Sequence, residues 1–469
     1  MVKELRLHVP ISKIANGTAH QLLTEFMGEI GALPFVHKLH IRVTHHTSGP
    51  EYLEDVANSC AVEFAQLLKS ITPSLKVIAV SCDSFTTDLS MDDIERNVTF
   101  DEGTLVVFID SLGNISNNHG VLGLEELSIN KLSSISIIPE ISTLRLLYKS
   151  DQEMRINLVH KCANTLQYLH IGICNAKSLV FDTNGHAVVY PSLHHLELYP
   201  GGHNTSIERV SVPNAVPFPI LRTLNMSMLY PFADDVMFRG NCDTLVRLKM
   251  SIIYETVLML NNSKPFESGY VNRRSVVVDG VWGDDSLAGI PGATMSKFMA
   301  NLAGSARRIQ SDNTLLVNTL ANVVPQGHEF EFVKELDAYK AKLPLFNILR
   351  ILQVLPSLVD LRCGAFGLGP ELAHIAAEDL PDHMASTYRD RGKNLQIWKL
   401  SVEYSSRDLH VSEYAMLLAL ACPTLHSVKL ADIPLSDFKP RITDALQSGP
   451  YSKYASQLNR LLDVKQLFE

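Results

Sequence analysis

The 469-residue sequence lacks the signatures of several classes of protein. It contains no run of 18 apolar residues, so no membrane-spanning helix is expected. It also lacks a P-loop, a G-x-G-x-x-G fingerprint, a G-x-S-x-G elbow and the kinase motifs, which place catalytic or phosphate-binding groups at fixed spacings. We therefore expect a protein that is not an enzyme and that holds no cofactor.

Cysteine does not occur in the patterns that bind metal ions or build disulfide frameworks. The seven cysteines include no C-x-x-C pair, which argues against both kinds of site. The first residues contain no uninterrupted apolar segment of the kind found in a secretory signal peptide. We therefore expect seven free thiols and a cytoplasmic or nuclear protein.

The sequence also lacks an excess of positive charge. Its 41 Lys and Arg residues are outnumbered by 50 Asp and Glu residues, which gives a formal net charge of -9. Nonspecific binding to nucleic acid or to an anionic membrane needs a dense basic field, so neither is the expected partner. Because 46% of the residues are hydrophobic and 19% are charged, we expect the chain to bury a large core.

The sequence does contain a recurring L-x-x-L-x-L segment, with aliphatic or similar residues at its first, fourth and sixth places. Four consecutive copies begin at Leu166, Leu193, Leu221 and Leu245, which lie 27, 28 and 24 residues apart. These spacings are within or close to the range of about 20 to 29 residues typical of leucine-rich repeats. The anchors of the four copies are Leu166/Leu169/Ile171, Leu193/Leu196/Leu198, Leu221/Leu224/Met226 and Leu245/Leu248/Met250.

Weaker copies of the same segment extend the array in both directions. Their anchors are Val2/Leu5/Leu7, Val36/Leu39/Ile41, Leu75/Ile78/Val80, Leu124/Leu127/Ile129, Ile141/Leu144/Leu146, Leu358/Leu361/Cys363, Leu395/Trp398/Leu400 and Leu425/Val428/Leu430. Between the copies lie segments with helical periodicity, at 18–31, 51–71, 151–162, 331–354 and 412–421. A strand followed by a helix, repeated along the chain, builds a parallel sheet with its helices on one face.

The expected fold class is therefore α/β: an irregular leucine-rich-repeat solenoid, or horseshoe, with parallel strands on the concave face and helices on the convex face. One repeat cannot fold alone, because burial of its few anchors does not offset the entropy cost of ordering a whole repeat. The pattern weakens between about 255 and 345. The expected organisation is a repeat array at 1–254, irregular or inserted repeats at 255–345, a second repeat array at 346–435 and a helical cap at 436–469.

Three segments carry a resemblance to a known family. They are CANTLQYLHIGICNAKSLVFDTNGHAVVYPSLHHLELY at 162–199, LRILQVLPSLVDLR at 349–362 and EYAMLLALACPTLHSV at 413–428. The chain resembles F-box-like leucine-rich-repeat proteins of early-diverging fungi. The resemblance implies a substrate-recognition component of a ubiquitin ligase. No F-box is visible, because the first strand is expected to begin at Val2, and this puts recruitment of a ligase in doubt.

Histidine pairs are the remaining candidates for chemistry. Adjacent strand residues point to opposite faces, so His194 and His195 cannot jointly chelate one metal ion. His45 and His46 have neither an acidic partner nor the H-x-x-x-H spacing of a helical metal site. We therefore expect no metal site and no catalytic residue.

Strand alternation indicates a different functional surface. If the anchors face the core, the third, fifth and seventh places line the concave face. The mixture of aromatic, charged and amide side chains there suits recognition of a protein partner, since Tyr and Arg are frequent hot spots. A plain solvated sheet would carry similar residues. The expected partner-binding residues are Tyr168, His170, His195, Glu197, Tyr199, Asn225, Arg247 and Lys249, beside the smaller Gly172, Thr223, Ser227 and Ser251.

A second row of alternating residues near the N-terminus is basic despite the acidic total. It consists of Arg6, His8, Lys38, His40 and Arg42. Three hypotheses follow: a monomeric module that binds an unidentified protein, which is the leading one; a binder of RNA or an acidic ligand through this row; and a structural scaffold. Phosphate-driven binding would fall steeply with salt, whereas a protein interface built on buried anchors would not.

Overall fold

The chain folds into two compact units, Met1–Leu221 and Arg222–Glu469, in a computed structural model. Each unit is described by itself. The structure describes residues 3–44, 54–75, 77–83, 104–105, 107–109, 111–112, 116–117, 120–121, 123–129, 141–146, 152–173, 176–200, 216–226, 244–252, 257–258, 261, 275–280, 290–303, 306–311, 314–322, 330–389, 391–401, 410–431, 435–463 and 465–466.

The first unit contains a parallel sheet whose strands follow the order of the chain, β1-β2-β3-β6-β7-β8-β9. Its strands are β1 (Glu4–Pro10), β2 (Lys38–Thr44), β3 (Val77–Asp83), β6 (Gly123–Ile129), β7 (Thr143–Leu146), β8 (Tyr168–Ile173) and β9 (His195–Pro200), with a small antiparallel pair β4 (Ser116–Asn117) and β5 (Gly120–Val121). Its helices are α1 (Ile11–Ala15), α2 (Thr18–Ile30), α3 (Glu54–Ile71), α5 (Gln152–Lys161) and α6 (Ala176–Val180).

The second unit repeats this arrangement with strands in the order β10 to β18. Its strands are β10 (Thr223–Met226), β11 (Arg247–Ile252), β12 (Ser275–Gly280), β13 (Arg308–Gln310), β14 (Glu335–Leu343), β15 (Asp360–Ala365), β16 (Ile397–Ser401), β17 (Ser427–Ala431) and β18 (Lys465–Gln466). Its helical segments are α9 (Gly292–Ala303), α10 (Thr314–Asn322), α11 (Leu345–Val354), α12 (Leu380–Thr387), α13 (Val411–Ala421), α14 (Leu435–Gln447), η3 (Ser452–Tyr454), α15 (Ala455–Leu458) and η4 (Asn459–Asp463).

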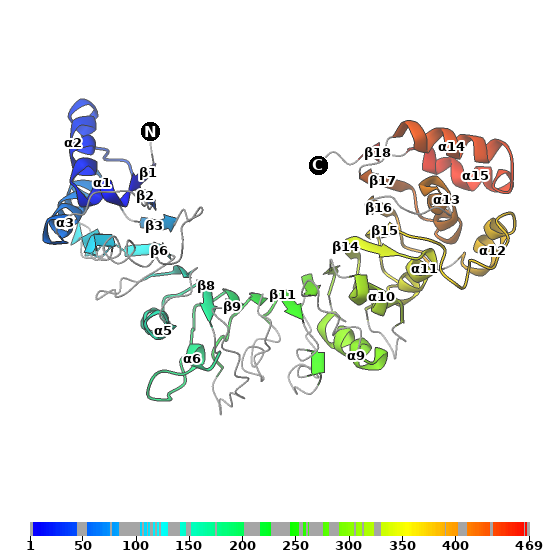
Figure 1. Cartoon of the computed structure of the whole chain (residues 1–469), viewed down its shortest axis with the longest axis horizontal. Coiled ribbons are helices and arrows are strands. Elements are labelled where there is room, and N and C mark those ends of the chain that lie inside the picture. The colour runs from blue at the N-terminus through cyan, green and yellow to red at the C-terminus, as the bar shows by residue number, and fades with distance from the viewer. Residues whose placement is uncertain are drawn as a thin grey trace. The chain divides into compact units, whose positions relative to one another are not determined.

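Helices cover one face of each sheet. In Figure 1, α1, α2 and α3 lie on one side of β1 to β3, and α11, α13 and α14 lie on one side of β14 to β17. The expected fold class, an α/β leucine-rich-repeat solenoid with parallel strands on one face and helices on the other, is confirmed in each unit. The sheet face away from the helices, which the sequence predicts to be concave, is called the open face below.

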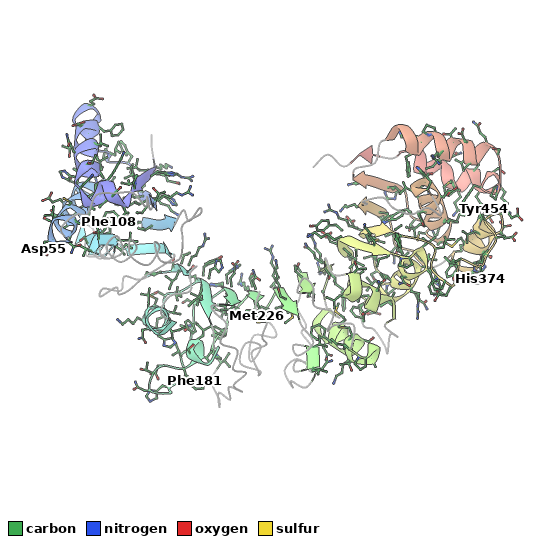
Figure 2. All side chains as sticks on the ribbon, viewed as in Figure 1. Asp55, Phe108, Phe181, Met226, His374 and Tyr454 are labelled. Atoms are coloured by element: carbon green, nitrogen blue, oxygen red, sulfur yellow. The ribbon has the colours of Figure 1, made fainter. Side chains whose placement is uncertain are left out.

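The predicted anchors form the core. All twelve anchors of the four clear copies are buried, and Leu166, Leu169, Leu193 and Leu196 are 0% exposed. Those four lie in the first unit, and Met226, labelled in Figure 2, marks the same pattern on β10 of the second. The strand register therefore agrees with the register predicted from L-x-x-L-x-L.

Several weaker copies follow the same pattern where their side chains are described. The anchors of the copies at Val36, Leu75 and Leu358 are buried throughout. In β1, Leu5 and Leu7 are half-buried, because among the described strands β1 has a neighbour on one side only. The side chains of Val2, Leu124, Leu127, Ile129, Leu146, Leu400 and Leu430 lie outside the described residues.

The backbone repeats as regularly as the anchors do. At the start of β8, the N–H groups of Gln167 and Tyr168 both donate to the Ser142 carbonyl, at 2.7 and 3.0 Å. At the start of β15, Val359 and Asp360 donate in the same way to Lys334, at 2.8 and 3.0 Å. These repeats thus enter the sheet through the same hydrogen bonds. The same pairing occurs at 37/38, 194/195, 246/247, 334/335, 396/397 and 426/427.

The prediction of a helix at 331–354 is wrong in its first half. The segment 331–354 contains strand β14 up to Leu343, and helix α11 begins only at Leu345. Its buried residues alternate along β14, at Leu336, Ala338, Ala341 and Leu343, with a register shift after Ala338. That shift breaks the two-residue period and leaves spacings that imitate a helix. Lys340 and Lys342 consequently lie on a strand and not on a helix.

The segment where the sequence pattern weakens still supplies strands to the sheet. Between 255 and 345 lie β12, β13 and β14, which pair in register with their neighbours. Val276, Val278, Ile309 and Leu336 are their buried anchors. After 436, helical turns are followed by β18, which pairs with β17. The structure divides the chain into two compact units. The predicted division into four parts stays a prediction.

The cysteines with described side chains are free. Burial raises the pKa of the Cys162 and Cys363 thiols to about 12, so both are protonated at neutral pH. The free cysteines are Cys60, Cys162, Cys363 and Cys422, and the side chains of Cys82, Cys174 and Cys242 lie outside the described residues. In the part of the chain that the structure describes, no helix is long and apolar enough to cross a membrane.

Replacing Leu169 with Asp is predicted to unfold the first unit locally. Leu169 has no exposed surface, so an unpaired carboxylate there would cost several kcal/mol, on the order of the penalty for burying an unbonded charge. Thermal melting and limited proteolysis measure the effect, and Gln167→Asp, at an exposed position two residues earlier, is the control. Unchanged protease resistance in Leu169→Asp would refute the strand register.

Candidate functional site

The open face of β7, β8 and β9 brings together four of the predicted partner-binding residues. Parallel pairing places Tyr168 beside His195 and His170 beside Glu197. On the other side of β8, Arg145 of β7 pairs with His170. All five residues occupy strand positions next to buried anchors, so alternation points them to the same face. Arg145, Tyr168, His170, His195 and Glu197 are called the Tyr168 cluster.

Planar groups stack through the middle of the Tyr168 cluster. The Tyr168 and His195 rings have centroids 4.4 Å apart and planes within 13° of parallel. The Arg145 guanidinium carbon lies 4.9 Å from the Tyr168 ring centroid, within the range of a cation–π contact. The phenol ring therefore packs between a guanidinium and an imidazole, each supplied by a neighbouring strand.

The Glu197 carboxylate connects the remaining groups. Its Oε1 lies 2.8 Å from His195 Nε2, and its Oε2 lies 3.5 Å from His170 Nδ1. The exposed fractions of the His170, His195 and Glu197 side chains are 25%, 29% and 23%. The cluster is thus held in place by its own contacts and still reaches solvent.

These contacts fix the charge state of the cluster. Burial acts to raise the pKa of Glu197, but the hydrogen bond from His195 and the charges of both imidazoles outweigh it and hold that pKa below its usual range. Burial and the nearby Glu197 charge raise the pKa of the Tyr168 hydroxyl. Burial lowers the pKa of His170 and outweighs the opposing effect of Glu197. At neutral pH the cluster therefore presents a carboxylate, a protonated phenol and a neutral His170 imidazole.

This arrangement suits recognition better than covalent chemistry. The five residues include no serine, cysteine or lysine nucleophile, and burial raises the pKa of the Tyr168 hydroxyl. They do offer stacked π-faces, one guanidinium and a carboxylate within one patch. Such a patch can contact a complementary surface through stacking and charge-assisted hydrogen bonds.

The remaining predicted partner-binding residues are Tyr199, Asn225, Arg247 and Lys249. The backbone of Tyr199 pairs with Gly172, and its side chain lies outside the described residues, as do Ser227, His45 and His46. In the second unit, Asn225 pairs with Lys249 in the β10–β11 register. Arg247 and Lys249 are exposed and Asn225 is half-buried. The predicted orientation of these three residues agrees with the burial of Leu248 and Met250.

Arg145 was not among the residues predicted from the sequence, although the signal was present. The copy anchored at Ile141 and Leu144 places Arg145 at its fifth position, the same position that His170 and Glu197 hold in theirs. Only the four clearest copies supplied the predicted face, so the copy immediately before them was left out.

The open face of the second unit carries ion pairs that the sequence prediction also missed. Arg308 on β13 contacts Asp337 at 3.0 Å and Glu335 at 3.8 Å on β14. Asp360 on β15 pairs with Lys399 on β16. These side chains largely neutralise one another across adjacent strands. They therefore offer less unbalanced charge than the basic N-terminal row.

The described His, Cys, Asp and Glu side chains are the candidates for metal ligands. No group of three or more His, Cys, Asp or Glu residues in the described ranges could hold a metal ion. His194 immediately precedes β9 and His195 begins it, so alternation points the two side chains to opposite faces of the sheet. His195 forms a hydrogen bond with Glu197.

Comparisons with known proteins give little beyond this geometry. No protein-family model matches the chain, and a search of curated protein sequences found no match. Among solved structures, the chain is similar to the leucine-rich repeat-containing protein LegL7 from Legionella pneumophila, at 13% sequence identity. The similarity covers 92% of each chain with a TM-score of 0.28. The fold assignment rests on the strand register and the recurring backbone hydrogen bonds described above.

The titration of His170 is predicted to report on the Tyr168 cluster. Its pKa is lowered from 6.5, so the unfolded chain binds this proton more readily than the folded chain. Stability should therefore fall as the pH drops through 6.5, and this slope should be smaller in His170→Gln. Denaturant unfolding between pH 8 and pH 5 measures the slopes, while NMR titration gives the midpoint of His170. A midpoint at or above 6.5 would contradict the described burial.

Proposed function

We propose that this protein is a binding module that contacts a partner protein through the Tyr168 cluster on the open face of its first unit. The observation that carries the proposal is the stack of Arg145, Tyr168 and His195, supported by Glu197. Tyr and Arg are enriched among the residues that dominate protein interfaces, and stacked side chains lose little further entropy on binding.

Charge also favours a protein partner. Glu197 and Arg145 place one negative and one positive group in the same patch, whereas a phosphate backbone would meet repulsion from the ionised Glu197. A complementary protein surface can satisfy both charges and cover the phenol ring. Because Glu197 already accepts a hydrogen bond from His195, part of the cost of burying this carboxylate in an interface is met within the cluster.

The proposal also covers the absence of catalysis, the cellular location and the oligomeric state of the protein. We infer a role in binding and not in catalysis, because the cluster contains no serine, cysteine or lysine nucleophile and its carboxylate is held by His195. Four free thiols suit a cytoplasmic or nuclear setting, and we expect a monomer. The resemblance to F-box-like proteins suggests substrate recognition for a ubiquitin ligase, and this finer role stays a prediction.

Replacing Tyr168 with Ala tests the proposed contact. The substitution removes the central ring of the stack, while the anchors Leu169 and Ile171 stay in place. A partner isolated by affinity capture with the unmodified protein should bind the variant at least tenfold more weakly, because a loss of about 1.4 kcal/mol has that effect. Calorimetry with the purified partner measures the change, and circular dichroism confirms the fold.

Phe26→Ala is the matched control for Tyr168→Ala. Phe26 is an aromatic residue of the same unit, 49% exposed, on helix α2. Its removal should leave the affinity unchanged. If Phe26→Ala abolishes binding while Tyr168→Ala binds normally, the contact lies on the helical face and the proposal fails.

A charge reversal on β11 tests the open face of the second unit independently. Arg247→Glu with Lys249→Glu changes two exposed positions and leaves the buried Leu248 and Met250 untouched. The melting temperature should hardly move, since exposed substitutions usually change stability by about 0.5 kcal/mol or less. We predict at least tenfold weaker binding of the same partner. Lys13→Glu with Lys69→Glu, at exposed helical positions, is the control.

A further inference from the structure

A small basic pocket lies on the open face of the first unit, at the strands farthest along the sheet from the Tyr168 cluster. Register pairs Arg6 with His40 and His8 with Arg42, so the four side chains form a two-by-two block on β1 and β2. Neighbours within the block are about 4.8 Å apart across the strands and about 7 Å apart along them. These four residues line a pocket of about 260 Å³ and are called the basic pocket.

The pocket exists because the third strand contributes a small residue. Ala79 of β3 pairs with His40 and lines the same pocket. A methyl group stands where β1 and β2 carry long side chains, so space remains beside the arginines and histidines. The pocket is smaller than the roughly 300 to 1,000 Å³ of sites for drug-sized ligands, so it fits one small chemical group.

Neighbouring charges keep the pocket cationic. Lys38 flanks it on β2, while Glu4 on β1 is the acidic residue in contact with it: Glu4 Oε1 lies 2.7 Å from Arg6 Nε and 3.4 Å from His40 Nε2. The hydrogen bond from Arg6 holds the pKa of Glu4 below its usual value. Glu4 is therefore ionised and orients Arg6 and His40. Among the described side chains at the pocket, the cations are Arg6, Arg42 and Lys38, beside this one carboxylate.

We propose that the basic pocket binds the dianionic phosphate group of a phosphate monoester. Guanidinium groups match phosphate oxygens through paired N–H donors, and imidazoles add further donors when protonated. The hydrogen bond to Glu4 uses only Nε of Arg6 and leaves the other N–H groups of that guanidinium to a ligand. This site is separate from the Tyr168 cluster, and the proposal does not depend on the proposed protein contact.

The geometry favours a monoester over an RNA backbone. Proteins bind single-stranded nucleic acid along extended basic grooves with stacking aromatic side chains. Here the basic residues gather around one compact pocket, and among its described lining residues the aromatic rings are the two imidazoles. A monoester also concentrates nearly two negative charges in one group, whereas a phosphodiester carries one per phosphate.

Calorimetric titration of the full chain at constant ionic strength tests this proposal. The probes are inorganic phosphate, a phosphoserine peptide, the same peptide without phosphate, and oligouridylate. Inorganic phosphate and the phosphopeptide should bind saturably with one site per chain, and the unmodified peptide should not bind. Tighter binding of the phosphopeptide would identify a phosphorylated protein as the ligand, and equal binding would identify a small phosphate ester.

Two variants distinguish phosphate binding inside the pocket from phosphate binding to a diffuse basic surface. Arg6→Gln with Arg42→Gln removes charge, whereas Ala79→Leu fills the pocket and keeps every charge; each should weaken phosphate binding at least tenfold. Lys13→Gln with Lys69→Gln removes two cations from exposed helical positions of the same unit and should change nothing. Circular dichroism verifies that each variant folds.

Three results would overturn the assignment. The first is the absence of saturable phosphate binding, and the second is oligouridylate binding at least as tight as that of the phosphopeptide. The third is unchanged affinity in a folded Ala79→Leu protein, which would show that the anion does not enter the pocket.

Discussion

Burial of alternate strand residues is the constraint on which both units depend. Each copy of the repeated segment commits its anchors to the layer between sheet and helices, where Leu169, Leu196 and Leu248 are almost wholly removed from solvent. The residues between the anchors are then forced to the other face by the geometry of a strand. The open face is thus a by-product of core formation, and its side chains are free to vary without loss of packing.

This freedom explains why the two candidate sites have different character on similar scaffolds. At β7 to β9, three adjacent strands supply the stack of Arg145, Tyr168 and His195, and Glu197 contacts His195. At β1 to β3, two strands supply cations and the third supplies only Ala79, so a pocket forms in place of a stack. The same register produces a filled surface in one place and a hollow in the other.

The sequence was sufficient for the fold class and for much of the first site, because periodicity encodes both. The anchors of the clear copies identified the strands, and alternation then placed Tyr168, His170, His195 and Glu197 on one face. The contacts among them could not be read from the sequence, since stacking and ion pairing depend on register between strands. Arg145 was missed for a simpler reason: its copy was treated as weak.

The failure at 331–354 has a local physical cause. A strand that shifts register loses its strict two-residue period, and β14 does so after Ala338. Strand β13 is hard to recognise because it has only 3 residues. Strand β12 is hard to recognise because its anchors Val276 and Val278 do not form the full segment. Pattern recognition therefore succeeded where repeats are regular and failed where the sheet itself is irregular.

The chain-ordered sheet also has a consequence for how the protein reaches its folded state. In the first unit, the described partners of a strand are never distant along the chain: Glu126 pairs with Thr143, and even the longest link joins Val77 to Gly123. Low sequence separation reduces the entropy lost in closing each loop and favours rapid folding. Synthesis on the ribosome releases residues slowly, at about 5 to 20 per second, compared with such local steps. Each strand of the first unit can therefore join the sheet soon after it emerges, so that exposed apolar surface is short-lived during translation.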